Sequence, residues 1–358
     1  MSSGMWNDET SGIHKFDISS ERGKAIYKAT GTVTGRMLNQ FCLGEWDDHL
    51  RVATTTGGNW DWTNWDNHIS IFKEDGGNLV KVGGLSGIGK EEEIYAARFM
   101  GDRGFLVTFR QTDPLYTFNL KDHSNPLVVG EWKGPGYSTY LHPYGENHLI
   151  SIGREGWRIA LSLYDLTNFA KPTLVERFMF QDEYSDLNSV ALNDHKGFTF
   201  YTSRNLLAIP YDGWIYSWQR EGYETGIFLF NVDTDGFTVA GNLALSGTQE
   251  YEGAAMRSVF IGDILYGISS CRITSCNLNT PSDEIDSLKL YTGDYCDNGY
   301  DNEPGWDDDW DGDWDEPDDT GSWEEDWETD GSEGDWDGEP DTDGGWEGDT
   351  DTASDSDW

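Results

Sequence analysis

The apolar residues of this chain fall into short runs that are separated by polar turns about every eight to twelve residues. The runs are rich in Val, Ile, Phe, Tyr and Thr, which favour strands. The apolar spacing of about 3.6 residues that indicates helices is nearly absent. The pattern therefore predicts an all-β fold made of many short strands.

One short motif recurs along the chain: an aromatic residue, then Asp or Asn, then a branched aliphatic residue. The copies are Phe16-Asp17-Ile18, Phe118-Asn119-Leu120, Tyr164-Asp165-Leu166 and Phe230-Asn231-Val232, with weaker copies at Phe72-Lys73-Glu74 and Cys276-Asn277-Leu278. Successive copies are 56, 46, 46, 66 and 46 residues apart. A period in the mid-forties, with an apolar strand before each copy and another after it, is typical of β-propeller blades.

The strands expected around these copies predict a β-propeller with about five complete four-stranded blades and an N-terminal half blade. The half blade begins at Gly12 and ends at Val33, with a charged turn at residues 19–24 between its two strands. In the first complete blade we expect strands at residues 38–43, 50–55, 69–72 and 79–82. The later blades cover residues 94–130, 136–180, 187–245 and 254–290, and residues 211–225 form an insertion in the third of these.

Composition divides the chain into three expected parts. Residues 1–11 are predicted to be an unstructured leader, residues 12–295 the propeller domain, and residues 296–358 an acidic low-complexity tail rich in Trp, Asp and Gly. After position 300 the tail holds 27 of the 66 acidic residues and no Lys or Arg. Because it has almost no aliphatic residues, we expect it to be disordered.

The N-terminal half blade raises the question of how the ring closes. A propeller usually completes a split blade with strands from the opposite terminus, which removes exposed strand edges. The sequence after Leu290 offers no apolar strand for this purpose. We therefore expect either an incomplete ring that needs missing upstream blades, or a compact five-blade ring with the half blade across its seam.

Charge and hydropathy exclude several classes of partner. The formal net charge of −42 repels nucleic acid and anionic membrane surfaces. Nothing reaches the 18 consecutive apolar residues that would indicate a transmembrane helix. The first residues, MSSGMWNDETSG, have neither the basic nor the apolar region of a secretory signal peptide.

A tryptophan-rich loop is the predicted ligand site of the propeller. Trp60, Trp62 and Trp65 lie among Asp, Asn and Thr between two expected strands, and therefore at a blade tip. Exposed tryptophans beside carboxylates and amides are typical of surfaces on which sugar rings stack. The alternative is that these rings cover the end of the blade or pack on the insertion.

The tail contains two segments that match a calcium-binding loop. In each, alternating acidic residues precede a Gly and a further acid at position twelve, so that successive oxygens surround one cation. The predicted ligands are Asp307, Asp309, Asp311 and Asp318 in the first loop and Asp326, Glu328, Asp330 and Asp337 in the second. Position twelve is Asp in both, which predicts that calcium sites here would be weak. In a segment almost half acidic, chance matches are common, so a solvated tail without defined sites is favoured over them.

Other candidate motifs favour structural roles. Residues 84–90 match the spacing of a phosphate-binding loop, but Glu91 replaces the magnesium ligand, so we expect a flexible connector between blades. The seven histidines show no paired metal spacing, and His142 and His148 flank a turn. Of the four cysteines, Cys42, Cys271, Cys276 and Cys296, the pair Cys271 and Cys276 would form a bridge only if a tight hairpin lies between them.

Three long stretches resemble a known family. Residues 38–56, 92–120 and 134–156 are similar to the secreted β-propeller domain family of bacteria and archaea, and the similarity extends from about Gly12 to Leu290. The resemblance implies the propeller fold and an extracellular or envelope location. It implies no reaction and no catalytic residues. Members of this family usually carry a signal sequence and further repeats upstream, which this sequence lacks.

These observations predict a non-catalytic extracellular or envelope β-propeller that serves as a recognition or scaffold module, with a calcium-binding acidic tail and a protein or carbohydrate partner. The alternative is a hydrolase or lyase that acts on an extracellular polymer through carboxylates at the propeller funnel. The side chains that converge at the inner strands should discriminate between the two, because such chemistry needs paired carboxylates.

Overall fold

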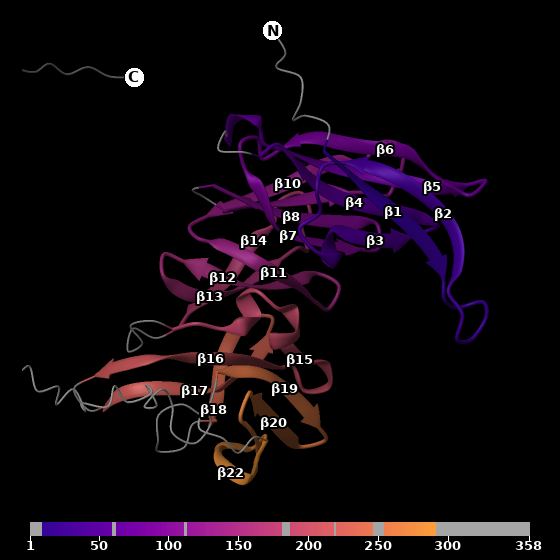
Figure 1. Ribbon diagram of the computed structural model, residues 1–358. Coiled ribbons are helices and arrows are strands. Elements are labelled where there is room, and N and C mark those ends of the chain that lie inside the picture. The colour runs from indigo at the N-terminus through magenta and orange to yellow at the C-terminus, as the bar shows by residue number, and fades with distance from the viewer. Residues whose placement is uncertain are drawn as a thin grey trace, which may run out of the picture. The chain divides into compact units, whose positions relative to one another are not determined.

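The computed structural model describes residues 9–58, 62–110, 113–180, 187–217, 220–245 and 254–290. Figure 1 shows that these residues form successive antiparallel sheets, coloured from indigo to orange along the chain. The only helices in the described ranges are short 3-10 turns, η1 to η5, and none could cross a membrane.

Four-stranded sheets form the five blades, each with its strands in chain order. Blade 1 contains β3 (Leu43–Trp46), β4 (His49–Thr56), β5 (Asp66–Asp75) and β6 (Asn78–Ile88). Blade 2 contains β7 (Glu93–Met100), β8 (Arg103–Phe109), β9 (Asp113–Asn119) and β10 (Leu127–Gly134). Blade 3 contains β11 (Tyr137–Tyr144), β12 (His148–Glu155), β13 (Arg158–Asp165) and β14 (Thr173–Met179).

The last two blades follow the same plan. Blade 4 contains β15 (Thr199–Tyr201), β16 (Leu206–Ser217), β17 (Arg220–Asp233) and β18 (Gly236–Ala244). Blade 5 contains β19 (Ala255–Ile261), β20 (Ile264–Ser269), β21 (Arg272–Asn277) and β22 (Thr280–Lys289). The connections carry η1 (Gln40–Cys42), η2 (Trp62–Asn64), η3 (Val190–Leu192), η4 (His195–Gly197) and η5 (Thr202–Arg204). The predicted five complete blades are therefore confirmed.

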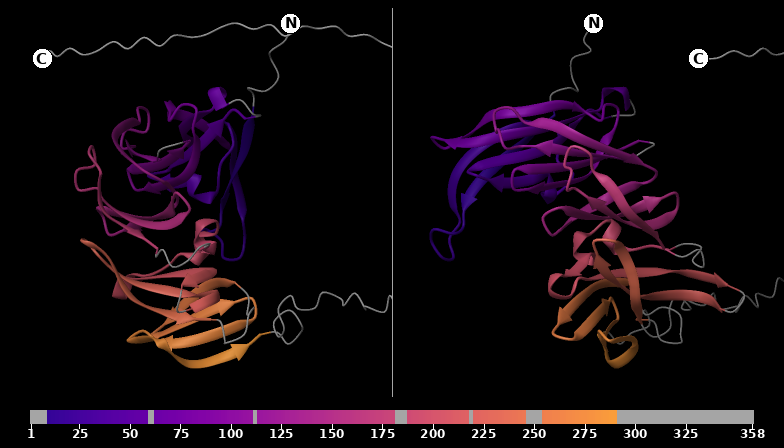
Figure 2. Two further views of the ribbon diagram at one scale, coloured as in Figure 1. Left: turned by 90° about the vertical axis from the view of Figure 1, so that its left-hand side faces the viewer. Right: turned by 180° about the vertical axis from the view of Figure 1, so that it is seen from behind.

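The N-terminal half blade is the hairpin of β1 (Thr10–Asp17) and β2 (Ile26–Thr34). β2 joins the outer strand of blade 1 through a parallel contact between Thr30 and Asn78, so the first sheet has six strands. Figure 2 shows this hairpin, in indigo, beside the first blade. β1 lies at the margin of the sheet, with β2 on one side of it.

The repeated motif ends the third strand of each blade and fixes the turn that follows. The side-chain oxygens of Asn119, Asp165 and Asn277 accept a hydrogen bond from the backbone N–H two residues later, at 3.0, 2.7 and 2.9 Å. The aliphatic residue then donates its backbone N–H to the turn between the first two strands of the same blade. These bonds run from Leu120 to Asp102, Leu166 to Asn147, Val232 to Asn205 and Leu278 to Asp263. The motif therefore ties both turns at one end of a blade together.

Apolar cores fill the spaces between consecutive blades, and the motif aromatic always faces the preceding blade. Phe118 packs with Ile69 and Ile71 of blade 1, and Phe230 packs with Leu161 and Leu163 of blade 3. Where blades lie on both sides of the third strand, apolar side chains are buried on both of its faces, as Leu163 and Tyr164 are in β13.

Close approach between neighbouring blades explains two of the glycines. A Cβ at Gly130 in β10 would lie 2.9 Å from the carbonyl oxygen of Ala170 in blade 3. A Cβ at Gly31 in the half blade would lie 2.7 Å from the Cβ of Leu79 in blade 1. Both contacts are too short for a side chain, so the half blade packs on blade 1 as complete blades pack on each other.

Two local expectations are corrected, and the structure shows the form of a third feature, the insertion. The strand expected at residues 38–43 begins only at Leu43, because the Asn39 side chain accepts from the N–H of Phe41 at 2.9 Å and caps η1 instead. Much of the expected flexible connector at residues 84–90 belongs to β6, which pairs with β5 and extends to Ile88. The insertion at residues 211–225 is an extension of the β16–β17 hairpin, in which Tyr211 pairs with Gly226.

Candidate functional site

An aromatic cluster occupies the meeting point of several inner elements. Phe41 of η1 lies 5.2 Å from the ring of Tyr140 on β11 and 5.0 Å from the ring of His195 on η4. The guanidinium carbon of Arg98 on β7 lies 4.7 Å from the centre of the Phe41 ring. Phe198 packs against Tyr140 with ring centres 5.1 Å apart. Aromatic rings, imidazoles and one cation thus meet here.

Burial keeps His142 and Tyr140 of this cluster neutral at physiological pH. Burial and the nearby charge of Arg98 lower the pKa of His142 to about 4. Burial also raises the pKa of Tyr140. The ring of His142 contacts Phe198 and Phe200, whereas that of His148 lies 6.0 Å from Tyr144. The cluster is therefore suited to packing and recognition rather than proton transfer.

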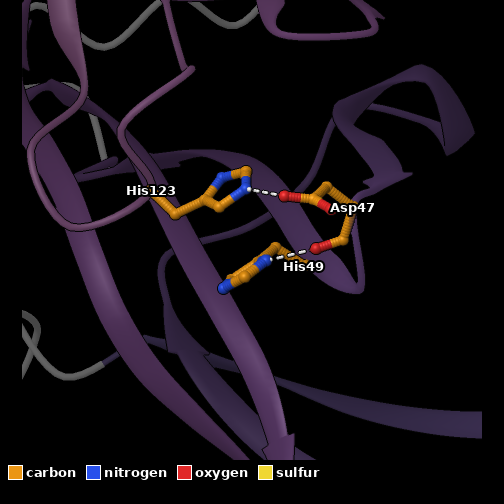
Figure 3. Close-up of side chains that lie close together, drawn as sticks. All are labelled: Asp47, His49 and His123. Atoms are coloured by element: carbon orange, nitrogen blue, oxygen red, sulfur yellow. Dashed lines mark hydrogen bonds and ion pairs between the residues drawn. The ribbon is translucent and has the colours of Figure 1, made fainter.

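A second group of polar side chains connects blades 1 and 2. Asp47 lies in the turn between β3 and β4, His49 begins β4, and His123 lies in the turn between β9 and β10. Figure 3 shows that both rings direct one nitrogen toward Asp47. His123 Nε2 lies 3.2 Å from Asp47 Oδ2, and His49 Nδ1 donates to the Asp47 carbonyl at 2.5 Å. The two imidazoles are stacked with ring centres 3.8 Å apart.

Local backbone geometry places these three residues together. Asp47 and Asp48 both adopt left-handed φ angles, 51° and 56°, as a tight two-residue hairpin requires. Where blade 1 meets the β9–β10 turn, a Cβ at Gly83 in β6 would lie 2.1 Å from the carbonyl oxygen of His123. Glycine at this position therefore permits the turn that carries His123 to approach blade 1.

Sequence reasoning missed this group, because His49 and His123 belong to different repeats and share no local spacing. A signal was nevertheless present in the first-to-second-strand turns of the blades. Blades 2, 3 and 5 place Gly101, Gly145 and Gly262 immediately after the first strand, whereas blade 1 places Asp47 there. A carboxylate that replaces glycine at a left-handed position is a departure from the repeat.

The structure describes only part of the predicted tryptophan site. Trp60 and the side chain of Trp62 lie outside the described residues. Trp65 is half-buried, and the guanidinium carbon of Arg36 lies 5.6 Å from the centre of its ring. Arg36 also donates to the Gly57 carbonyl at 2.5 Å and to Glu93 at 3.1 Å. Trp65 is therefore held against the end of blade 1, and sugar stacking at this loop stays a prediction.

The predicted calcium ligands lie in the tail and outside the described residues. Those ligands are Asp307, Asp309, Asp311, Asp318, Asp326, Glu328, Asp330 and Asp337. Within the part of the chain that the structure describes, the group suited to a metal ion is Asp47, His49 and His123.

The cysteines do not form the disulfide between Cys271 and Cys276 that the sequence left open. Cys42 and Cys276 are free and buried, whereas Cys271 is disulfide-bonded. A bridge between Cys271 and Cys276 is thus ruled out, because the latter lies in β21 and faces the core between blades 4 and 5. Burial raises the pKa of the Cys276 thiol to about 11, which keeps it protonated.

Comparison with known proteins agrees with this architecture. A sequence profile described as a beta propeller domain matches residues 3–281. The chain belongs to the beta propeller domain family. Two archaeal relatives, each described as an uncharacterised protein, are 34% identical to it over 284 residues in Archaeoglobus fulgidus and over 266 residues in Methanocaldococcus jannaschii. The alignments cover 79% and 74% of this beta propeller protein but 39% and 38% of the relatives, so it spans about two fifths of their length.

Two solved structures are also similar. The Sqt1 protein of Saccharomyces cerevisiae has a TM-score of 0.48 and 12% identity, over 77% of this chain and 67% of that one. The Sqt1 protein of Chaetomium thermophilum has a TM-score of 0.37 and 10% identity, over 68% and 70% of the two chains.

Proposed function

We propose that this beta propeller protein is a non-catalytic recognition and scaffold module that binds a β-sheet face on its N-terminal half blade. One observation carries the proposal. Phe16 and Ile18 of the half blade are 52% and 76% exposed, whereas their counterparts Phe118 and Leu120 in blade 2 are fully buried. In the complete blades this motif faces the preceding blade, so the half blade presents an apolar surface shaped for another blade.

Blade 5 carries surfaces of matching chemistry. Val259 and Ile261 on β19 are 42% and 62% exposed, and Leu288 on β22 is 62% exposed. The opposite side of the blade packs Leu265 and Cys276 against blade 4. A second copy of the chain can therefore offer an apolar blade face to the half blade. Such head-to-tail contact uses two different surfaces and does not require two-fold symmetry.

Self-association of the full-length chain tests this proposal. We expect concentration-dependent oligomers in sedimentation equilibrium, and a monomer for either Phe16→Asp or Ile261→Asp, because each change buries a charge in the interface. A mixture of the two variants should form dimers, since each retains the surface that the other lacks. Leu127→Asp, at a 47% exposed position on blade 2, is the matched control and should leave association unchanged.

Two results would contradict the proposal. A wild-type chain that stays monomeric at every concentration would show that the half blade does not take up a blade face from a second copy. Oligomers that persist equally in both variants would place the contact elsewhere.

An extracellular or envelope location remains part of the proposal. The disulfide at Cys271 supports it, because disulfides persist in oxidising compartments. The measurement is the mass of the chain after thiol alkylation, with and without reduction, in protein isolated from its native host. Four alkylated cysteines without reduction would argue for a reducing compartment.

We also propose weak calcium binding by the tail, on the basis of its two loop matches. Trp310 lies at position four of the first loop and Trp327 at position two of the second, so calcium should change the tryptophan fluorescence of a peptide spanning residues 301–358. An equal response to magnesium would mean general charge screening.

The enzyme alternative gains no specific support. The groups that converge at the aromatic cluster, namely Phe41, Tyr140, His142 and Phe198, are not the paired carboxylates that hydrolysis of a glycosidic polymer requires. Their convergence favours binding.

A further inference from the structure

We propose that Asp47, His49 and His123 form a zinc site that joins blades 1 and 2. One ligand atom of each residue lies within 4.8 Å of those of the other two. Two imidazole nitrogens and one carboxylate oxygen are a ligand set of zinc sites, with a fourth position open to water. Calcium and magnesium prefer shells made of oxygen alone, so this set selects a transition metal.

To hold the ion, the three ligand atoms, which lie within 4.8 Å of one another, must move closer, and one of the two stacked imidazoles must rotate. Zinc bonds of about 2.0–2.2 Å place tetrahedral ligand atoms roughly 3.3 Å apart. His123 Nε2 and Asp47 Oδ2 already lie 3.2 Å apart. The Asp47 side chain is 75% exposed, so it has room to adjust, and the ion can enter from solvent.

Both imidazole rings turn one nitrogen toward Asp47. His123 Nδ1 is buried and has no hydrogen-bond partner among the described residues, so the polar contact of the ring is on the side that faces Asp47. His49 makes its contact toward the same residue.

The backbone supplies an independent argument. Asp47 holds a φ angle of 51°, a conformation that glycine adopts without strain and that blades 2, 3 and 5 give to Gly101, Gly145 and Gly262, at 57°, 60° and 60°. In blade 1, Asp47 adopts this conformation less favourably than glycine would. Its side chain, however, brings a carboxylate next to His49 and His123. A ligand role accounts for that choice.

The site would act on the interface between two blades. Asp47 and His49 belong to the β3–β4 hairpin of blade 1, and His123 belongs to the β9–β10 turn of blade 2. A zinc ion bound to all three would fasten these turns together and stabilise the folded chain by mass action.

Zinc titration of the full-length chain by calorimetry tests the assignment, with excess magnesium present to occupy the carboxylates of the tail. We expect one tight zinc site in the wild type and an increase in its melting temperature. Asp47→Gly removes the carboxylate and places at this position the residue used by other blades. It should weaken zinc binding about tenfold or more while leaving the metal-free protein equally or more stable. His123→Gln should weaken binding to a similar extent.

The matched control is Asp48→Gly, which relieves the same type of backbone strain at a φ angle of 56° but leaves all three ligands. Its zinc affinity should equal that of the wild type. Equal zinc affinity in the wild type, Asp47→Gly and His123→Gln would overturn the proposal. So would a tight site that magnesium displaces, since that behaviour belongs to oxygen ligands.

Discussion

The half blade and blade 2 contain the same motif in different surroundings. In blade 2, the third strand has blades on both sides, and Phe118 and Leu120 are fully buried. In the half blade, Ile13 faces blade 1 and is buried, while Phe16 on the other face is exposed. The difference shows that the motif contributes two separable things: a turn that forms locally, and an apolar contact that needs a preceding blade.

The polar residues of β1 sharpen this comparison. Gly12 and His14 share the outward face with Phe16, and His14 Nδ1 lies 2.9 Å from the hydroxyl of Thr30 on the neighbouring strand. The equivalent strand of blade 3, β13, is buried along six consecutive residues. The outward face of the half blade is thus apolar at one end only, which limits the contact that a second blade face can make there.

The largest expected difference between the two regions concerns the motif aromatic. Phe118→Ala should lower the free energy of unfolding by about 3–5 kcal/mol, because it opens a cavity in the core between blades 1 and 2. Phe16→Ala should lower it by about 0.5 kcal/mol or less, since the ring is half exposed. Chemical denaturation of the two variants measures both values. Comparable losses would mean that Phe16 is covered in solution.

The blade repeat could be predicted from sequence because it is encoded locally. A full copy of the motif, such as Phe118-Asn119-Leu120 or Tyr164-Asp165-Leu166, combines a strand end, an Asx-type turn and an aromatic core residue within three positions. The spacing of the copies therefore gives the number of blades. The same logic found the half blade at Phe16. It failed at residues 38–43, where an apolar run is interrupted by Asn39, whose side chain caps a 3-10 turn in place of a strand.

The candidate metal site could not be predicted in the same way. His49 and His123 are brought together by packing between blades, and the contact depends on Gly83, in a third segment. Sequence periodicity describes each blade by itself and contains no information about which turn meets which. The comparison of equivalent turns, Asp47 against Gly101, is the sequence signal that would have directed attention to blade 1.

Glycine substitutions should have effects of intermediate size, and they test whether the half blade packs on blade 1 as one complete blade packs on the next. Gly31→Ala and Gly130→Ala should each lower the free energy of unfolding by about 1–3 kcal/mol, because the added methyl group meets the neighbouring blade. Gly12→Ala is the control, since the nearest atom to its Cβ lies 4.0 Å away. If Gly31→Ala behaved like this control, the half blade would not be packed on blade 1 in solution.

The smallest effect concerns the turn itself, which should behave alike in both regions. Hydrogen bonds from Ser19 and Ser20 lower the pKa of Asp17, and those from Thr167 lower the pKa of Asp165. A carboxyl whose pKa is lowered by folding stabilises the fold at pH values above its unfolded pKa of about 3.9, and this contribution is lost as the pH falls toward the folded value.

Asp17→Asn and Asp165→Asn retain the oxygen acceptor, as Asn119 does in blade 2. We therefore expect each variant to melt slightly below the wild type at pH 6, and this deficit should shrink progressively as the pH falls below the unfolded pKa of about 3.9. Melting curves across this range decide the point, and a deficit that persists at low pH in one region only would show that its turn depends on the blade around it.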